Sequence, residues 1–157
     1  RDLGDTADLA STLANRLLRA AEPSGVFPHT VPAVAQSKVR RHVGCFADQV
    51  YPIQALSRWF KVNQDPTSLA VANRCARNIV DRQGPDGQWW WHYDVRNGSV
   101  VEGFPVYSVH QHAMAPMALL DLADAGGTSY IDAICRGLGW MTGRPETGGP
   151  PCRSGRS

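Results

Sequence analysis

A short stretch at residues 83–89 decides how the chain is organised, and it reads Gln83-Gly84-Pro85-Asp86-Gly87-Gln88-Trp89. It follows a segment with helical periodicity. A related turn occurs earlier, where residues 23–27 read Pro23-Ser24-Gly25-Val26-Phe27. Glycine permits the tight backbone that such a turn needs, and an aromatic residue two positions later can fold back onto the preceding helix. The two stretches therefore predict a repeated unit that contains a glycine turn.

The segments around the two turns also match. Residues 13–16 resemble residues 71–74, and the glycine turns follow with a difference of four residues in spacing, which one added helical turn would explain. Two later segments each carry an internal proline, Pro52 and Pro116, and end in Ala-Leu. The unit is a helix, a glycine turn, a long loop and a proline-bearing helix, with a period of about 60 residues. Such a repeat predicts stacked α-hairpins.

Apolar residues at helical spacing predict five helices, at about residues 5–21, 45–62, 65–80, 110–125 and 128–141. Asp65 followed by Pro66 is the clearest start signal, because an aspartate accepts first-turn amides and proline suits the first helical position. Strand signals are confined to residues 99–101 and 106–109. The predicted fold class is therefore all-α. The apolar side chains that we expect in the core include Leu9, Leu13, Phe27, Ile53, Met114, Met117, Leu120, Ile131, Leu138 and Met141.

The form Q-x-x-x-G-x-W at residues 83–89 resembles the QW motif of terpenoid cyclases, and the whole pattern resembles the α/α-toroid superfamily, including six-hairpin carbohydrate enzymes. The resemblance implies stacked helical hairpins that form part of an α/α toroid over residues 1–142. Because such toroids usually contain about six hairpins, it implies that further hairpins of the same chain are missing. The chain lacks the D-x-D-D motif of terpenoid cyclases and any zinc-ligand set of prenyltransferases. Residues 143–157 predict a disordered or non-native tail.

Composition excludes several classes of protein. The 157 residues carry 16 Lys and Arg against 14 Asp and Glu, a net charge of +2, so no basic surface for nucleic acid is indicated. No apolar run is long enough to span a membrane. Four irregularly spaced cysteines, at positions 45, 75, 135 and 152, predict reduced thiols and a cytoplasmic protein. We expect no metal and no cofactor.

Aromatic, acidic and imidazole side chains gather between residues 89 and 112. Aromatic rings pack against the C–H faces of sugars, while carboxylates and imidazoles bind hydroxyls and transfer protons. The predicted catalytic residues are Asp94, Glu102 and His110. The predicted substrate-binding residues are Asp48, Tyr51, Trp90, Trp91, His92, Tyr107 and His112. Asp48 has an alternative role as an acid in the first turn of a helix, and at least one of the three consecutive tryptophans must face the core. We expect this one to be Trp89, packed on the end of the helix that contains Gln83.

These residues and the resemblance favour a carbohydrate-processing enzyme of the glycosidase or epimerase kind, or a fragment of one. Its partner would be a small molecule or an oligosaccharide. Two alternatives stay open. One is a non-catalytic helical-repeat module that binds a glycan or a protein, and the other is a terpenoid-cyclase-like enzyme. Carboxylates that converge on one cavity would favour catalysis, whereas aromatic residues without them would favour binding.

Overall fold

A computed structural model describes residues 3–30, 40–107 and 109–143, without the side chains of residues 3–5, 109–111 and 143. These residues form five helices: α1 (Leu3–Ala20), α2 (Phe46–Asn63), α3 (Pro66–Asp81), α4 (Val109–Asp124) and α5 (Ile131–Gly143). Two strands of three residues each, β1 (Val43–Cys45) and β2 (His92–Asp94), form a small sheet. The fold is therefore mainly α-helical, as predicted. The predicted tail lies outside the described residues, apart from the end of α5.

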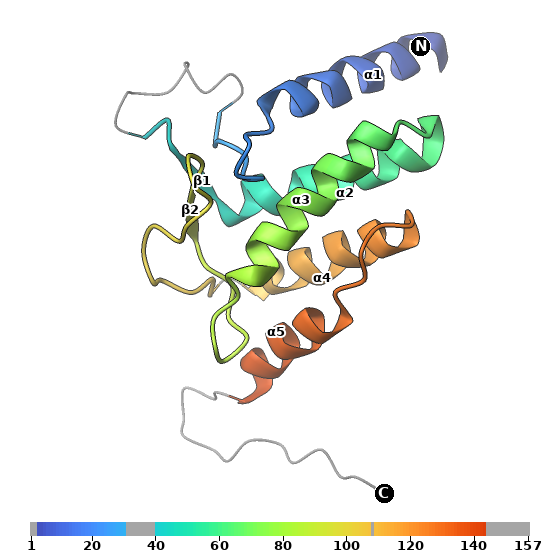
Figure 1. Cartoon of the computed structure of the whole chain (residues 1–157). Helices are drawn as coiled ribbons and strands as arrows, with labels where there is room; N and C mark the ends of the chain where they lie inside the picture. Colours follow the sequence, from blue (N-terminus) through green and yellow to red (C-terminus); the bar gives the residue numbers. More distant parts are fainter. Residues whose placement is uncertain (1–2, 31–39, 108, 144–157) are drawn as a thin grey trace, which may run out of the picture.

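The helices alternate in direction along the chain. Figure 1 shows that α1, α3 and α5 run one way, whereas α2 and α4 run the other way. Helix α2 packs against both α3 and α4, and α4 packs against α5. The sheet lies at the end of the molecule where α2 and α4 begin (Figure 1). Long loops from both repeats therefore meet at this one end.

The sheet is antiparallel and joins the loop before α2 to the loop before α4. Val43 is paired with Asp94, and Cys45 is paired with His92. The strands do not lie at residues 99–101 or 106–109, where the sequence predicted them. Val100, in the first of these ranges, forms only an isolated bridge with Tyr93. Short strands that pair across 50 residues depend on how the helices bring the loops together, so local strand propensity does not locate them.

Local signals account well for α3 and for the core. The Asp65 side chain accepts the Thr67 N–H at 3.0 Å, and Pro66 takes the first helical position, as predicted. The largest fully buried side chains come from α2, α3, α4 and the loops before α2 and α4, and they include Phe27, Phe46, Ile53, Leu56, Ile79, Trp89, Tyr93, Leu119 and Leu122. The core thus lies between the central helices.

Several side chains that we expected in the core are exposed. Leu9 and Leu13 on α1 are 58% and 50% exposed. The same holds for side chains on α4 and α5, namely Met117, Leu120, Ile131, Leu138 and Met141. An amphipathic stripe is buried only where a neighbouring element covers it. Within the described part of the chain, α1 and α5 stand at the two ends of the row of helices, so part of each stripe has no cover.

Two glycine turns show that the repeat is regular. Gly25 has a φ of +83°, and a Cβ there would lie 2.9 Å from the Arg74 carbonyl oxygen. Gly87 has a φ of +95°, and its Cβ would lie 2.2 Å from the Arg136 carbonyl oxygen. The glycine and the arginine of the second contact each lie 62 positions after those of the first, at 87 instead of 25 and at 136 instead of 74. A constant shift also aligns Ala14 with Ala76, so the added helical turn that the sequence suggested is not needed.

Gln83 and Trp89 connect the end of α3 to α5. Trp89 is 1% exposed, which confirms the predicted burial. The Gln83 Nε2 donates to the carbonyl oxygens of Gly87 and Ala133, both at 2.9 Å. A Cβ at Gly137 would lie 2.8 Å from Trp89 Nε1 and 3.4 Å from Gln83 Nε2. The turn therefore closes α3 and at the same time fixes the next helix.

None of the described helices combines the length and the apolar character needed to cross a bilayer.

Candidate functional site

The loops that meet beside the sheet line an open cavity of about 290 Å³. Its lining comes from the loop before α2, from β1, from β2 and from the loop after β2. The lining residues are His29, Arg40, Val43, Cys45, His92, Val101 and Glu102. Both repeats thus contribute side chains that titrate or carry charge to one site.

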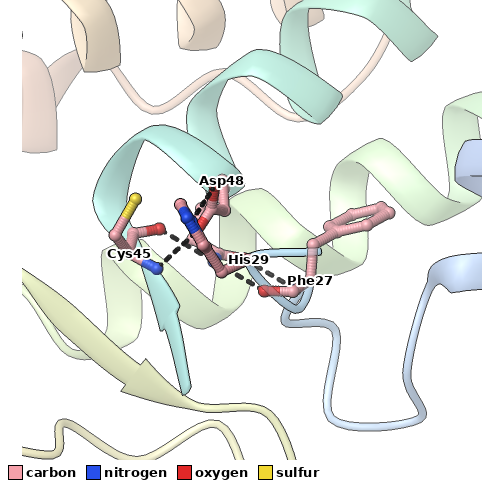
Figure 2. A network of polar contacts seen from close by, with 5 residues as sticks. Phe27, His29, Cys45 and Asp48 are labelled. Carbon is pink, nitrogen blue, oxygen red and sulfur yellow. Dashed lines mark hydrogen bonds and ion pairs between the residues drawn. The ribbon is translucent and has the colours of Figure 1, made fainter. Parts of the chain in front are cut away.

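The first repeat contributes an imidazole–carboxylate pair. His29 Nδ1 lies 3.0 Å from Asp48 Oδ2, and the same carboxylate oxygen accepts the Cys45 N–H at 2.7 Å. Figure 2 shows His29, Cys45 and Asp48 gathered at the beginning of α2. Asp48 therefore has the alternative role that the sequence left open, as an acid in the first turn of a helix, and it also holds an imidazole at the cavity.

The second repeat contributes a similar pair. His92 Nδ1 lies 2.5 Å from Glu102 Oε1, and the ring of Trp91 lies beside the His92 ring with 6.4 Å between centroids. The Val101 N–H donates to the His92 carbonyl oxygen at 3.0 Å, which holds the two segments together. Both side chains of the pair are partly exposed, at 38% for His92 and 42% for Glu102, so a ligand in the cavity can reach them.

Buried contacts from α2 fix the first loop. The fully buried Gln49 accepts the Phe27 N–H at 2.8 Å, and its Nε2 lies 3.0 Å from the carbonyl oxygens of both Phe27 and Cys45. A Cβ at Gly44 would lie 2.0 Å from the Phe27 carbonyl oxygen, so only glycine fits there. His29, two residues beyond Phe27, is therefore attached to a rigid base.

Among the residues that the structure describes, Cys45 is the one thiol that lines this cavity. Burial, together with a hydrogen bond to the Asp48 carboxylate, raises the pKa of the Cys45 thiol to about 11. The thiol is therefore protonated near neutral pH and is a poor nucleophile on its own.

Asp94 follows the cavity residue His92 by two positions, and its carboxylate is bonded to Arg96. Its Oδ1 accepts both the backbone N–H and the Nε–H of Arg96 at 2.9 Å. These hydrogen bonds hold the pKa of Asp94 at about 2, below its ordinary value of 3.8. A carboxyl with such a pKa stays ionised near neutral pH, which does not suit a general acid. Asp94 is also not among the residues that line the cavity.

The Asp94 contacts predict an effect of pH on stability. Because the pKa is lower in the folded protein, the carboxylate stabilises the fold above about pH 4, and this contribution disappears as the pH falls towards 2. We expect Asp94→Asn to lower the free energy of unfolding at pH 7 by on the order of 1–2 kcal/mol, since Arg96 is largely exposed. Urea unfolding of both proteins between pH 2 and 7 should show the difference shrinking towards pH 2. A difference that is constant with pH would contradict this account.

The remaining predicted residues lie at other places. Trp90 Nε1 donates to the Arg82 carbonyl oxygen at 2.6 Å, so its polar edge has a structural partner. Tyr51 lines a separate cavity of about 270 Å³ together with residues of α2 and α4, namely Val50, Gln54, Met114 and Met117. The structure therefore does not bring Tyr51 to the cavity that His92 lines.

Tyr107 and His112 belong to a third group, around Trp140 of α5. Ring centroids lie 5.9 Å apart for Tyr107 and Trp140, and 5.2 Å apart for His112 and Trp140. His112 is 7% exposed, and its Nδ1 has no hydrogen-bond partner among the described residues. Burial lowers the pKa of His112. The side chain of His110 lies outside the described residues, and its catalytic role stays a prediction.

His29 was missed from the sequence. The regular shift of 62 residues could have revealed it. This shift aligns His29 with Trp91, which belongs to the aromatic and imidazole cluster of the second repeat. Cys45 gave no signal, since it stands alone and far from the other cysteines. Of the predicted residues, His92 and Glu102 line the cavity, Trp91 lies beside His92, and Asp48 contacts His29, which also lines it.

The chain was compared with protein-family models, with curated proteins and with solved structures, and no match was found in any of the three.

Proposed function

We propose that the protein is a carbohydrate-processing enzyme of the glycosidase or epimerase kind, and that the cavity beside the sheet is its active site. The observation that carries this proposal is the pair of imidazole–carboxylate contacts, His29 with Asp48 and His92 with Glu102, at one cavity. A site with two such pairs can give a proton from one side and accept one from the other. Both glycosidic cleavage and epimerisation need this.

In this proposal Glu102, Arg40 and Trp91 each have a defined task. Glu102 orients the His92 ring through its contact with the ring Nδ1. Arg40 lines the same cavity and offers a guanidinium to an anionic group of the substrate, such as the carboxylate of a uronic acid. Trp91, beside His92, supplies an aromatic face for a sugar ring.

The proposal includes an α/α-toroid arrangement in the whole protein. Its support is the regular repeat of 62 residues and the contacts of Gln83 and Trp89 with α5, which correspond to what the resemblance to the QW motif implies. Further hairpins beside α1 and α5 would cover the apolar stripes that these helices expose.

A panel of oligosaccharides tests the proposed function. The panel contains neutral and uronic-acid-containing sugars, and calorimetry measures their binding to the wild type and to Arg40→Ala. We expect a uronic-acid-containing ligand to bind the wild type and to bind Arg40→Ala about tenfold more weakly, because a charge-assisted contact contributes on the order of 1–3 kcal/mol. Arg58→Ala, which removes an arginine distant from the cavity, should not change the affinity. If no sugar of the panel binds, the proposal fails.

One observation favours the second candidate, a non-catalytic helical-repeat module. An apolar groove of about 580 Å³ lies between α1 and α2, and Leu13, Trp59 and Val62 are among its lining residues. Exposed apolar grooves of this size are common at sites of interaction with other proteins. Sugar binding without any change in the sugar over long incubation would favour this candidate over the enzyme.

A further inference from the structure

The side chains of His29, Cys45 and Asp48 form a compact group of metal-ligating atoms. An imidazole nitrogen, the Cys45 Sγ and an Asp48 carboxylate oxygen all lie within 4.8 Å of one another. Figure 2 shows that they come from two segments, the loop after Phe27 and the junction where β1 leads into α2. Cys45 and Asp48 lie 16 and 19 positions after His29, so no short sequence motif indicates the group.

We propose that His29, Cys45 and Asp48 bind a divalent transition-metal ion, with zinc as the first candidate. Zinc accepts nitrogen, sulfur and oxygen ligands together and prefers a tetrahedral arrangement. One thiolate and one carboxylate would balance the two positive charges of the ion. On binding, the thiol gives its proton to solvent as the sulfur–metal bond forms.

The distances require only a small adjustment. Zinc–ligand bonds of about 2.0–2.3 Å place tetrahedral ligands about 3.3–3.8 Å apart, which is less than the present 4.8 Å limit. His29 Nδ1 already lies 3.0 Å from Asp48 Oδ2, and the His29 side chain is 61% exposed, so it can turn to reach the ligand spacing. Asp48 is held by the Cys45 N–H and is only 17% exposed. Cys45 and Asp48 thus stand in fixed positions at the beginning of α2, and a rotation of the exposed His29 side chain completes the ligand set.

The position of the group also indicates what the ion would do. Three protein ligands leave one tetrahedral position for water, which is the arrangement of catalytic zinc sites. His29 and Cys45 line the cavity that contains His92 and Glu102. A water molecule on the ion would therefore face that second imidazole–carboxylate pair, and it would replace the His29–Asp48 pair as the proton-transferring group on its side of the cavity.

Metal titration tests this inference directly and does not depend on the proposed reaction. Zinc binding to the whole chain is measured by calorimetry, and cobalt(II) is added separately because a thiolate ligand gives it a charge-transfer absorption band. We expect one ion per chain. Cys45→Ser should remove the band, and His29→Ala should weaken zinc binding by at least about tenfold, the scale on which changes around a metal site act.

Two further variants keep the test specific. Cys135→Ser removes an exposed thiol on α5 and should leave both the band and the affinity unchanged. Circular dichroism shows whether each variant is folded, and His29→Ala changes an exposed side chain, so it should fold. The inference is overturned if the folded wild type binds no zinc or if the band persists in Cys45→Ser. It is also overturned if His92→Ala weakens binding while His29→Ala does not.

Discussion

Replacing Trp89 with alanine should lower the free energy of unfolding by about 3–5 kcal/mol, the usual cost of removing a large buried aromatic side chain. The ring is 1% exposed and packs against Phe46 with 6.1 Å between centroids. It also lies against Gly137 of α5, so its loss opens a cavity at the point where α3, α5 and the loop meet. Few other single changes would remove contacts from so many elements.

Chemical denaturation measures this effect. Trp59→Ala is the matched control, because Trp59 is only partly buried and lies at the groove between α1 and α2. We expect its cost to be clearly smaller than that of Trp89→Ala. A cost below about 1 kcal/mol for Trp89→Ala would mean that the ring does not hold the turn to α5.

Removing the imidazole or the carboxylate of the second pair should reduce turnover strongly. With a substrate identified from the sugar panel, His92→Ala and Glu102→Gln should each lower kcat by about 10²–10⁴, the usual contribution of a general acid or base. Both side chains are partly exposed, so neither change should affect stability much. Initial rates across a pH series would show whether the pair transfers the proton.

Asp94→Asn tests whether the carboxylate at the end of β2 belongs to this site. Asp94 bonds to Arg96 and does not line the cavity, so this variant should be less stable but retain kcat. If Asp94→Asn abolishes turnover in the folded protein while Glu102→Gln does not, the active site lies elsewhere than proposed.

The candidate site was partly predictable. Glu102 and His92 stand near each other in sequence, close to three tryptophans, and the composition of that stretch indicated a polar, aromatic site. The residues on the other side of the cavity could not be predicted from the sequence in the same way. His29 and Asp48 are 19 residues apart, and they meet because Gln49 ties the loop to α2 through the Phe27 backbone. Such a contact depends on a buried amide, which leaves no periodic pattern.

The sequence by itself determined the five helices of the described residues, the start of α3 at Asp65 and Pro66, the burial of Trp89 and the presence of a repeat. These features follow from local spacing, because capping, proline position and amphipathic periodicity act within a few turns of the chain. Only the tertiary structure decided which apolar stripes are covered, as exposed Leu9 and Leu13 show. It also decided that β1 pairs with β2 and that His29, Cys45 and Asp48 meet. Burial and convergence are properties of neighbours distant in sequence, so they arise only when the helices pack.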